Sequence, residues 1–439
     1  MQNNLGDWRR THYSNMVTAE LDGRKVTVFG WIEDIRDLGG LIFLTLRDRG
    51  GFVQVTVSRK AASKEVLSRI GELGRQSAVG VRGVVKARAE SPRGVEIVPE
   101  EVKILGGAVH PLPLDPTGRV PADPDVRFDS RVLDLRRVEQ RAMFIVRHEV
   151  LREIRSFLAG RGFVEIHTPK IIATATEGGA NLFPVDYFEG KAYLAQSPQL
   201  YKEELVTVFE KVFEVGPVFR AEPSHTRRHV TEFTSVDIEE AFVTGEDIMK
   251  IQEELVQSVI QHVQGSCQPQ LEILGAKPDM LKLPLKRYSY KKVLDELAGC
   301  GVEVPWGEDI PTPALRELSM LHRKEYYFIV DWPTKAKVFY IKPREDNPEL
   351  CYAFDFMYEW IEVSSGGTRV DSKEILVSRL REQGLNPDDF KHHLNVFDWG
   401  MPPHAGFGLG LERLLMAVTG VENIMECILF PRSRTRLYP

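Results

Sequence analysis

The residue types best suited to chemistry lie between positions 213 and 242, where two runs of strand-forming residues flank a short polar loop. Side chains alternate between the two faces of a strand, so Arg220 and Glu222 share a face of the first run. In the second run, Val236 and Ile238 form an apolar face, and the opposite face carries Phe233, Ser235, Asp237 and Glu239. If the runs pair antiparallel, one solvent-facing patch holds an arginine, carboxylates and an aromatic ring.

The loop between the runs adds Arg227, Arg228 and His229 to this patch. An arginine fork holds a phosphate through two hydrogen bonds. An aromatic ring stacks on a base, and a carboxylate accepts from an exocyclic amine or binds a metal ion. The patch therefore suits a ligand with a flat ring and several phosphates. The alternative is a charged hairpin tip on an ordinary sheet, because exposed charges are common.

A second stretch, residues 406–413, reads GFGLGLER. Its alternating glycines allow a strand to pass close to a ligand. A helix is predicted from Leu411 to Val418, and Arg413 then lies in its first turn, where the helix end favours phosphate. The stretch is not a dinucleotide fingerprint, because position 411 is not glycine, and the chain has no GxxxxGK[ST] motif. The sequence therefore indicates a phosphate site of another type.

These two stretches together resemble motifs 2 and 3 of the class II aminoacyl-tRNA synthetases: FRAE, RH and TEF in the first, GxGxGxER in the second. Finer details resemble the archaeal-type aspartyl enzymes of subclass IIb. The resemblance implies an α+β fold, with an N-terminal OB-fold β-barrel followed by an antiparallel catalytic sheet flanked by helices. It also implies ATP with Mg²⁺, L-aspartate and tRNA(Asp) as ligands, and a homodimer. Three alternatives stay open: an asparaginyl enzyme of the same class, a tRNA-independent enzyme that amidates aspartate, and a non-catalytic RNA-binding protein.

The resemblance assigns a role to each residue of the nucleotide site. Arg220 bridges the α-phosphate and the amino-acid carboxylate, and Arg413 grips the γ-phosphate. Glu362 and Ser365 bind the metal ion. The full set of expected ATP-binding residues is Arg220, Ala221, Glu222, Arg228, His229, Val230, Phe233, Glu362, Gly410, Leu411, Glu412 and Arg413.

The segment QSPQLYK, residues 196–202, resembles a signature of aspartate enzymes. Because the substrate side chain is a carboxylate, cations are required beside it, and Lys202 and Arg369 are the candidates. Otherwise, Lys202 is an ordinary solvated side chain. The resemblance implies that aspartate contacts Glu177, Gln196, Gln199, Lys202, Arg220, Asp237, Ser365 and Arg369.

Residues 24–105 contain five strand-like runs, with a helical run between the third and fourth. This is the pattern of an OB-fold, whose open face binds oligonucleotides, although other small β-barrels share it. The resemblance places Phe43 against an anticodon base and Gln54 and Glu96 on base edges. At two positions that distinguish strict from relaxed enzymes, Pro92 fits the relaxed pattern and Glu33 fits neither. The expectation is an enzyme that also charges tRNA(Asn).

The chain of 439 residues is too long for one ordinary core. Its net charge is −6, but residues 1–110 carry +4 and the remainder −10, which fits a phosphate-contacting first domain on an acidic body. We expect three parts: an OB-fold anticodon-binding domain at 1–110, a proline-rich hinge at 111–137, and the class II catalytic domain at 138–439. Proline density predicts an extended chain without helix over residues 111–128.

Within the catalytic part, a helix is predicted at residues 138–160, followed by a strand in GFVEIHTPKI, and an amphipathic helix at 246–264. Residues 364–367 are predicted to form a tight turn. The segment 265–350 is interpreted as an inserted region without chemistry of its own.

Four widely separated cysteines and a polar N-terminus complete the sequence evidence. The cysteines form no CxxC pair, so we expect buried free thiols rather than structural zinc. No signal-peptide pattern and no apolar run long enough to cross a bilayer are present, so we expect a cytoplasmic protein without a membrane partner.

Overall fold

The computed structural model describes residues 5–173, 182–221 and 230–439, so the expectations for Glu177, Glu222, Arg228 and His229 lie outside the described residues. The chain divides into two compact units, Met1–Pro121 and Ala122–Pro439. The division falls within the proline-rich segment.

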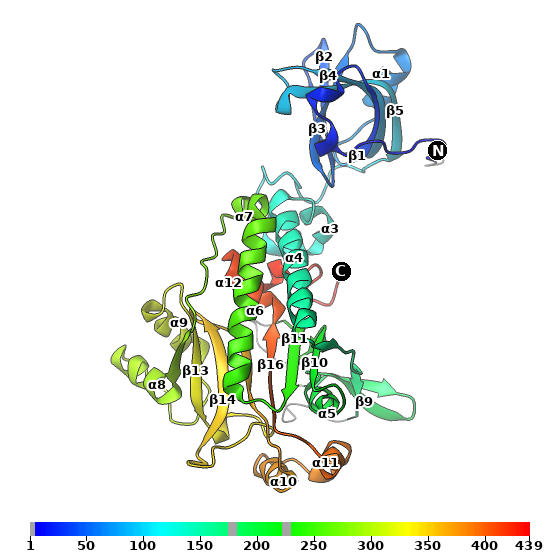
Figure 1. The fold of residues 1–439 in the computed structure, drawn as a ribbon. Coiled ribbons are helices and arrows are strands. Elements are labelled where there is room, and N and C mark those ends of the chain that lie inside the picture. The colour runs from blue at the N-terminus through cyan, green and yellow to red at the C-terminus, as the bar shows by residue number, and fades with distance from the viewer. Residues whose placement is uncertain (1–4, 174–181, 222–229) are drawn as a thin grey trace. The chain divides into compact units, whose positions relative to one another are not determined.

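The first unit contains a closed five-stranded barrel in the order β1-β2-β3-β5-β4, which confirms the OB-fold prediction (Figure 1). Helix α1 lies between the third and fourth strands in sequence, as predicted. Alternate residues such as Val28, Leu44 and Val55 fill the interior. The elements are β1 Lys25–Asp37, β2 Leu41–Asp48, β3 Gly51–Ser58, α1 Lys64–Gly71, β4 Ala78–Ala87 and β5 Val95–Gly106, with 3₁₀ turns η1 Ser14–Met16, η2 Ala19–Leu21 and η3 Pro92–Gly94.

The second unit is built, in its described residues, on an eight-stranded sheet of order β12-β13-β14-β15-β16-β11-β10-β6. Its outer pairs β12–β13 and β10–β6 are parallel and the strands between them are antiparallel. The strands are β6 Val164–Glu165, β10 Lys211–Phe219, β11 Glu232–Ala241, β12 Lys286–Ser289, β13 Tyr326–Pro333, β14 Leu350–Tyr358, β15 Ile361–Thr368 and β16 His404–Gly410.

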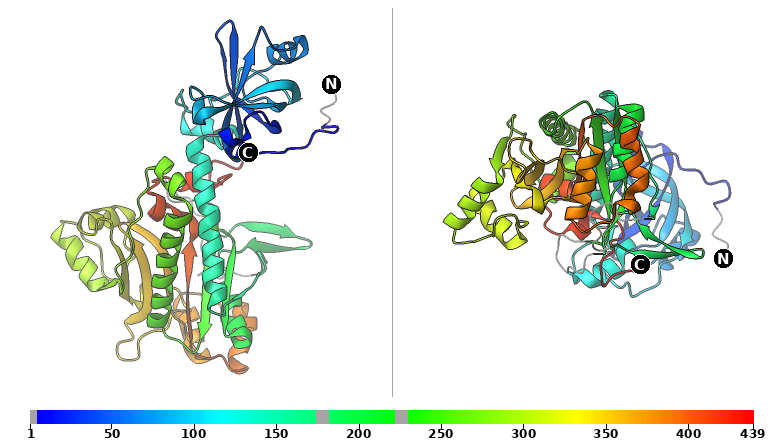
Figure 2. Two further views of the ribbon diagram at one scale, coloured as in Figure 1. Left: turned by 45° about the horizontal axis from the view of Figure 1, so that its top comes forward. Right: turned by 90° about the horizontal axis from the view of Figure 1, so that it is seen from below.

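A small second sheet has the order β7-β9-β8. Its strands are β7 Ile171–Ile172, β8 Pro184–Tyr187 and β9 Gly190–Leu194. Figure 2 shows the β8–β9 hairpin extending outward from the body of this unit.

Helices cover both faces of the large sheet (Figures 1 and 2). On one face α4, α6 and α12 form a core with the apolar side of the central strands; on the other, α8 to α11 pack on β13 and β14. The helices are α2 Pro124–Asp129, α3 Arg131–Asp134, α4 Val138–Gly160, α5 Gln199–Phe209, α6 Gly245–Ser266, α7 Gln268–Leu274, α8 Tyr290–Gly299, α9 Thr312–Leu321, α10 Lys373–Glu382, α11 Lys391–Asp398 and α12 Leu411–Thr419, with 3₁₀ turns η4 Thr334–Ala336, η5 Pro387–Phe390 and η6 Ile424–Cys427.

The apolar faces predicted for the helix at residues 138–160 and for the second strand of the hairpin are both buried. Helix α4 buries Val150, Ile154 and Leu158, and the apolar face of β11 buries Val236 and Ile238 in the same core. The polar face of β11 is therefore turned away from α4 and α6, because neighbouring side chains of a strand point to opposite faces.

Two predictions for the region around α4 are wrong. The proline-rich segment does contain helix at its end, because Pro124 occupies the first position of α2, where a missing N–H costs no intrahelical hydrogen bond. The strand expected after α4 is reduced to two short pieces, β6 and β7.

The tight turn predicted at residues 364–367 is also wrong, because these residues lie inside β15. Gly366 and Gly367 allow β15 to pack closely against its neighbouring strands, and they do not form a turn. A Cβ atom on Gly366 would lie 2.5 Å from the carbonyl oxygen of Gly406, and one on Gly367 would lie 2.4 Å from that of Tyr352. The strand therefore passes too close to its neighbours for larger residues.

The cysteines are free thiols, and three of them, Cys267, Cys351 and Cys427, are buried as expected, whereas Cys300 is exposed. Within the described ranges, no helix has both the length and the apolar character needed to cross a bilayer.

Candidate active site

The polar floor of the site is one row of residues that crosses four neighbouring strands. In the sheet register, Asp237 on β11 lies opposite Gly408 on β16, Gly408 opposite Ser365 on β15, and Ser365 opposite Asp355 on β14. Because Gly408 has no side chain, the middle of this row is low, and two carboxylates and a hydroxyl surround the depression.

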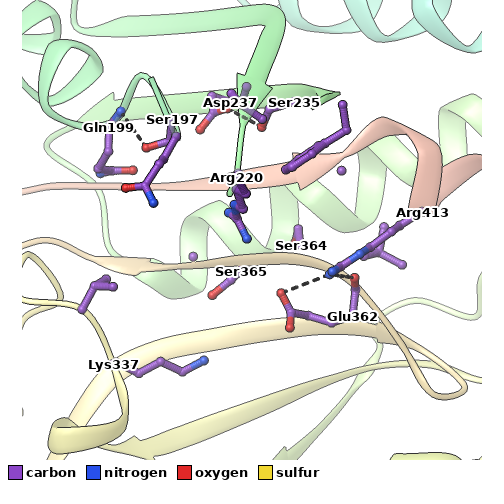
Figure 3. Close-up of a pocket in the computed structure, with 18 of the residues that line it drawn as sticks. Ser197, Gln199, Arg220, Ser235, Asp237, Lys337, Glu362, Ser364, Ser365 and Arg413 are labelled. Carbon is purple, nitrogen blue, oxygen red and sulfur yellow. Dashed lines mark hydrogen bonds and ion pairs between the residues drawn. The ribbon is translucent and has the colours of Figure 1, made fainter. Parts of the chain in front are cut away.

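A cavity of about 310 Å³ lies over this row. This volume is at the lower end of the range found for small-molecule sites. Arg220 and Arg413, which come from the two separate sequence stretches, line the same cavity (Figure 3). The expected site residues found in its wall are Gln196, Gln199, Arg220, Val230, Phe233, Asp237, Glu362, Ser365, Arg369, Gly410, Glu412 and Arg413.

Arg220 and Phe233 are neighbours across the hairpin. The guanidinium carbon of Arg220 lies 5.4 Å from the centre of the Phe233 ring, and the Arg220 amide donates to the carbonyl oxygen of Thr231 at 3.0 Å. A guanidinium and a ring at this separation offer two surfaces to one ligand, a charged one for phosphate and a flat one for a base.

Glu412 and Arg413 lie in the first turn of α12 but contact different partners. The Glu412 carboxylate accepts from Arg147 at 2.8 Å and from the backbone amide of Thr234 at 3.1 Å, which ties α12 to α4 and β11. Nη1 of Arg413 donates to the carbonyl oxygen of Glu362 at 2.8 Å and lies 3.6 Å from the Glu362 carboxylate. Arg413 is thereby held beside Glu362 at one side of the cavity.

Three expected site residues within the described ranges do not line the cavity. Leu411 points into the apolar core, and Ala221 is half-buried at the end of the first run. Lys202 is 1% exposed and lies beneath the cavity floor. Its Nζ donates to Asp237 at 3.0 Å and to the carbonyl oxygen of Phe407 at 3.2 Å, so it is not the solvated side chain of the alternative interpretation.

Arg369 does reach the cavity, and it is strongly oriented. Its Nε and Nη2 donate to the two oxygens of Glu239 at 2.9 and 3.1 Å, a bidentate pair. Burial alone would lower the pKa of this guanidinium, but Glu239 raises it above its usual value, so Arg369 is cationic at any ordinary pH. A fixed cation at this end of the cavity can receive a ligand carboxylate.

Four ionisable groups gather at the other end: Asp355, Lys337, Glu362 and Asp309. Nζ of Lys337 donates to both oxygens of Asp355 at 2.9 and 2.7 Å. Burial raises the pKa of Asp355 to about 6, with Glu362 adding to the effect and Lys337 opposing it. Burial by itself would lower the pKa of Lys337, but Asp355 and Glu362 raise it.

The sequence analysis did not predict that Asp309 and Lys337 belong to the site, because it assigned no chemistry to residues 265–350. That assignment is wrong: Asp309, Lys337 and Tyr340 of the segment line the cavity. The signal available in the sequence was weak, since an isolated Asp and Lys in a mixed region carry no motif. The remaining lining residues that the sequence analysis did not assign are Ser197, Val218, Ala336, Val338, Ile341, Val363, Ser364, Gly366, Gly408 and Ile424.

The donor set at Glu362 fits a magnesium ion only in partnership with a ligand. Within the described residues, no three His, Cys, Asp or Glu side chains come together as a metal site. Glu362, Ser365 and Asp355 supply two carboxylates and a hydroxyl, and Mg²⁺ in proteins is commonly held by one or two carboxylates plus substrate phosphates. The cavity therefore fits Mg²⁺ that arrives with a nucleotide.

In the barrel, the expected base-reading residues lie together on β2, β3 and β5. Phe43 is half-buried, whereas its neighbours Ile42 and Leu44 are buried, so Phe43 is on the outer face of the barrel. Gln54 pairs with Glu96 in the register of β3 and β5, and its Nε2 donates to the Glu96 carboxylate at 3.2 Å. Both are buried, and Glu96 also lies 2.8 Å from Arg88.

The two positions expected to report on tRNA choice are placed differently. Glu33 accepts from Arg47 at 2.8 Å and from Gln76 at 3.2 Å. Pro92 begins the 3₁₀ turn η3 between β4 and β5.

Comparison with known proteins identifies both units. Residues 123–434 match the family described as tRNA synthetases class II (D, K and N), and residues 26–105 match the OB-fold nucleic acid binding domain. A protein of Methanopyrus kandleri named Aspartate–tRNA(Asp/Asn) ligase is 49% identical over 97% of this chain and 99% of its own length. One of Pyrococcus abyssi named Aspartate–tRNA(Asp) ligase is 48% identical over 98% of this chain and 100% of its own.

Solved structures show the same fold. The asparaginyl-tRNA synthetase of Pyrococcus horikoshii complexed with asparaginyl-adenylate has a TM-score of 0.93 and 34% identity, covering 98% of this chain and 100% of that one. A putative aspartyl-tRNA synthetase of Leishmania major Friedlin has a TM-score of 0.91 and 26% identity, covering 100% and 96% of the two chains.

Proposed function

Because this chain belongs to the class II tRNA synthetases of the D, K and N group, with an OB-fold domain before the catalytic one, we propose that it is an aspartate–tRNA ligase. It activates L-aspartate with ATP to aspartyl-adenylate and transfers the aspartyl group to the 3′ end of tRNA(Asp), and also to tRNA(Asn). The observation that carries the proposal is the single cavity that holds Arg220, Arg413 and Arg369 around Asp237, Glu362 and Ser365.

The first step needs no protein nucleophile. The α-carboxylate of aspartate attacks the α-phosphorus of ATP, pyrophosphate leaves, and the mixed anhydride forms. Arg220 neutralises the charge that develops at the α-phosphate, and Arg413 holds the γ-phosphate. Preorganised cations in a partly dry cavity lower the barrier without reorganising during the reaction. Phe233 stacks on the adenine, and Val230 and Gly410 border the nucleotide.

Glu362 and Ser365 would hold a magnesium ion that arrives with ATP, and Asp355 lies opposite Ser365 in the register. The ion would supply positive charge against the phosphates. Glu222, Arg228 and His229, which lie outside the described residues, complete this nucleotide site in the proposal.

Amino-acid selection rests on fixed charges. Arg369 receives the side-chain carboxylate, Asp237 and Glu177 receive the ammonium, and Gln196, Gln199 and Ser365 border the substrate. Lys202 acts from beneath the floor by holding Asp237 and Glu239 in place.

We further propose the following organisation: an anticodon-binding domain at residues 1–110, a hinge at 111–137 and a catalytic domain at 138–439, working as a cytoplasmic homodimer. Phe43, Gln54 and Glu96 read the anticodon. Pro92 and Glu33 occupy the two positions that determine whether tRNA(Asn) is accepted in addition to tRNA(Asp). Light scattering of the purified protein tests the dimer, since a monomeric mass contradicts it.

The decisive experiment measures ATP–pyrophosphate exchange with aspartate and with asparagine, followed by charging of purified tRNA(Asp) and tRNA(Asn). We expect exchange with aspartate and charging of both tRNAs. Exchange driven by asparagine instead would establish the alternative, an asparaginyl enzyme, which the similarity to the asparaginyl-tRNA synthetase structure motivates. Charging of tRNA(Asp) alone would overturn the relaxed tRNA range and leave the amino-acid assignment intact.

A further inference from the structure

A buried ionic cluster lies directly behind the amino-acid end of the cavity. Glu203 is one helical turn after Gln199 on α5 and is 1% exposed. Its Oε2 lies 3.2 Å from Nε2 of His393 on α11 and 3.7 Å from Nε2 of His404 on β16. Neither Glu203 nor His393 lines the cavity, so the direct chemistry of the reaction does not account for them.

The geometry around His393 requires a cation. Its Nε2 faces Glu203, and its Nδ1 lies 3.2 Å from the carboxylate of Glu204, so each ring nitrogen meets a carboxylate. Burial would lower the pKa of His393, but Glu203 and Glu204 raise it to about 9. Burial would raise the pKa of Glu203, but His393 and His404 lower it strongly, so its carboxylate is ionised.

The ionised carboxylate fixes the side-chain amide of Gln199. Nε2 of Gln199 donates to Oε1 of Glu203 at 2.5 Å. The amide oxygen is consequently turned toward Arg369, whose Nη2 lies 3.5 Å away. The reverse orientation is unfavourable, because it would place an amide N–H against a guanidinium and an amide oxygen against a carboxylate.

As a result, the hydrogen-bond acceptors around the side-chain subsite are already engaged. Both oxygens of Glu239 accept from Arg369, and one of them also lies 3.4 Å from Lys202. The oxygens of Asp237 accept from Lys202 and from the Ser235 hydroxyl. A ligand carboxylate needs only donors, whereas a carboxamide also needs an acceptor for its N–H groups.

We propose that Glu203, paired with His393, is a positioning residue that makes the subsite select a carboxylate over a carboxamide by keeping the Gln199 oxygen turned toward Arg369. The inference rests on the proposed function and deepens it, because it names the device that rejects asparagine. With Glu203 neutralised, the amide of Gln199 can turn, which carries its oxygen toward residue 203 and sets an N–H against Arg369, the cation that receives the side-chain carboxylate.

The test is Glu203→Gln, assayed by ATP–pyrophosphate exchange with aspartate and with asparagine. One hydrogen bond weakened by about 1.4 kcal/mol corresponds to a tenfold change. We therefore expect the ratio of kcat/KM for aspartate to that for asparagine to fall about tenfold, mainly through a higher KM for aspartate. Loss of general packing would lower both kcat/KM values together, and an unchanged ratio overturns the inference.

A second variant, His393→Gln, removes the cation and keeps Glu203, and we expect the same direction of change. Its matched control is His392→Gln, on the neighbouring and exposed residue of α11, which should keep the wild-type ratio. If Glu203→Gln fails to fold, His393→Gln alone decides the matter, since a wild-type ratio in that variant overturns the inference. Wild-type protein that prefers asparagine would instead overturn the proposed function, so the two failures are distinguishable.

Discussion

Arg220 and Arg413 are 193 positions apart in the sequence, yet their guanidinium groups serve one cavity (Figure 3). Two cations brought together by tertiary structure repel each other unless an anionic ligand joins them. The structure offsets part of this repulsion through Glu362, which lies 3.6 Å from Arg413. This arrangement supports the proposed polyphosphate ligand of the cavity.

We predict that Arg220→Ala lowers the rate of aspartate-dependent ATP–pyrophosphate exchange by about 10²–10³-fold, like the loss of one preorganised donor. The matched control is Arg161→Ala, at an exposed arginine that follows α4 and pairs with Glu254. The control should exchange at the wild-type rate. Near-normal exchange by the Arg220 variant would remove this residue from the catalytic assignment.

The pair formed by Lys337 and Asp355 gives a second prediction at this scale. Lys337→Gln leaves a buried carboxylate without its cation, and such a loss costs about 3–5 kcal/mol of unfolding free energy. Since burial already raises the pKa of Asp355 to about 6 in the presence of Lys337, the variant should raise it further.

The sign of the pH effect follows from linkage. A carboxyl group whose pKa is raised in the folded state binds protons more tightly there, so it lowers stability as pH rises through that pKa. The stability deficit of Lys337→Gln should therefore shrink as pH falls from above the variant's raised pKa to about 6, the wild-type value. Urea unfolding at pH 5 and pH 7.5 measures this, and an equal deficit at both values contradicts the prediction.

At the scale of elements, the glycines of β15 and β16 determine how closely the central strands approach. A Cβ atom on Gly406 would lie 2.2 Å from the carbonyl oxygen of Ile238 and 2.3 Å from the Glu239 carboxylate. The first of these atoms is backbone of the neighbouring strand, so a side chain at this position displaces β11 together with the residues that it carries into the site.

Gly406→Ala is accordingly predicted to lower the unfolding free energy by about 1–3 kcal/mol, the usual cost of overpacking. Gly160→Ala is the comparison, because a Cβ atom there meets open space at the end of α4. Reduced freedom of the unfolded chain should make that variant neutral or more stable by about 0.4–1 kcal/mol. Chemical denaturation of both proteins tests the difference, and equal midpoints would disprove the close-approach explanation.

At the scale of the whole molecule, the described residues of each unit have their own apolar packing, one core inside the barrel and two large clusters and a small one in the catalytic unit. The proposed function divides between them: adenylate formation belongs to the second unit, and recognition of the anticodon belongs to the first. Changes in the barrel should therefore affect tRNA charging and leave amino-acid activation unaltered.

Phe43→Ala tests this division of labour. Loss of one stacked base costs about 1–3 kcal/mol, so kcat/KM for tRNA in the charging assay should fall by roughly 5–150-fold. Aspartate-dependent pyrophosphate exchange should stay at the wild-type rate. Leu38→Ala, at an exposed residue between β1 and β2, should leave both activities unchanged. A parallel loss of exchange in the Phe43 variant would mean that the residue acts on folding.

The sequence alone determined those features that are encoded locally. Alternation of polar and apolar residues defined the hairpin of β10 and β11, helical spacing defined α4, and the succession of short runs defined the barrel. The two arginine motifs could be recognised because each is a compact string of neighbouring residues, the first around the adjacent strands β10 and β11 and the second at the junction of β16 and α12.

Tertiary structure alone decided what depends on distant partners. The segment around Lys202 does not indicate that this side chain will be buried under Asp237. The pair Gly366 and Gly367 is typical of a turn, and only the packing of the two neighbouring strands shows that both residues lie inside β15. Asp309 and Lys337 enter the site from a segment without a motif. In each case the position of the side chain is set by strands or helices far away in the sequence, whose packing no local pattern records.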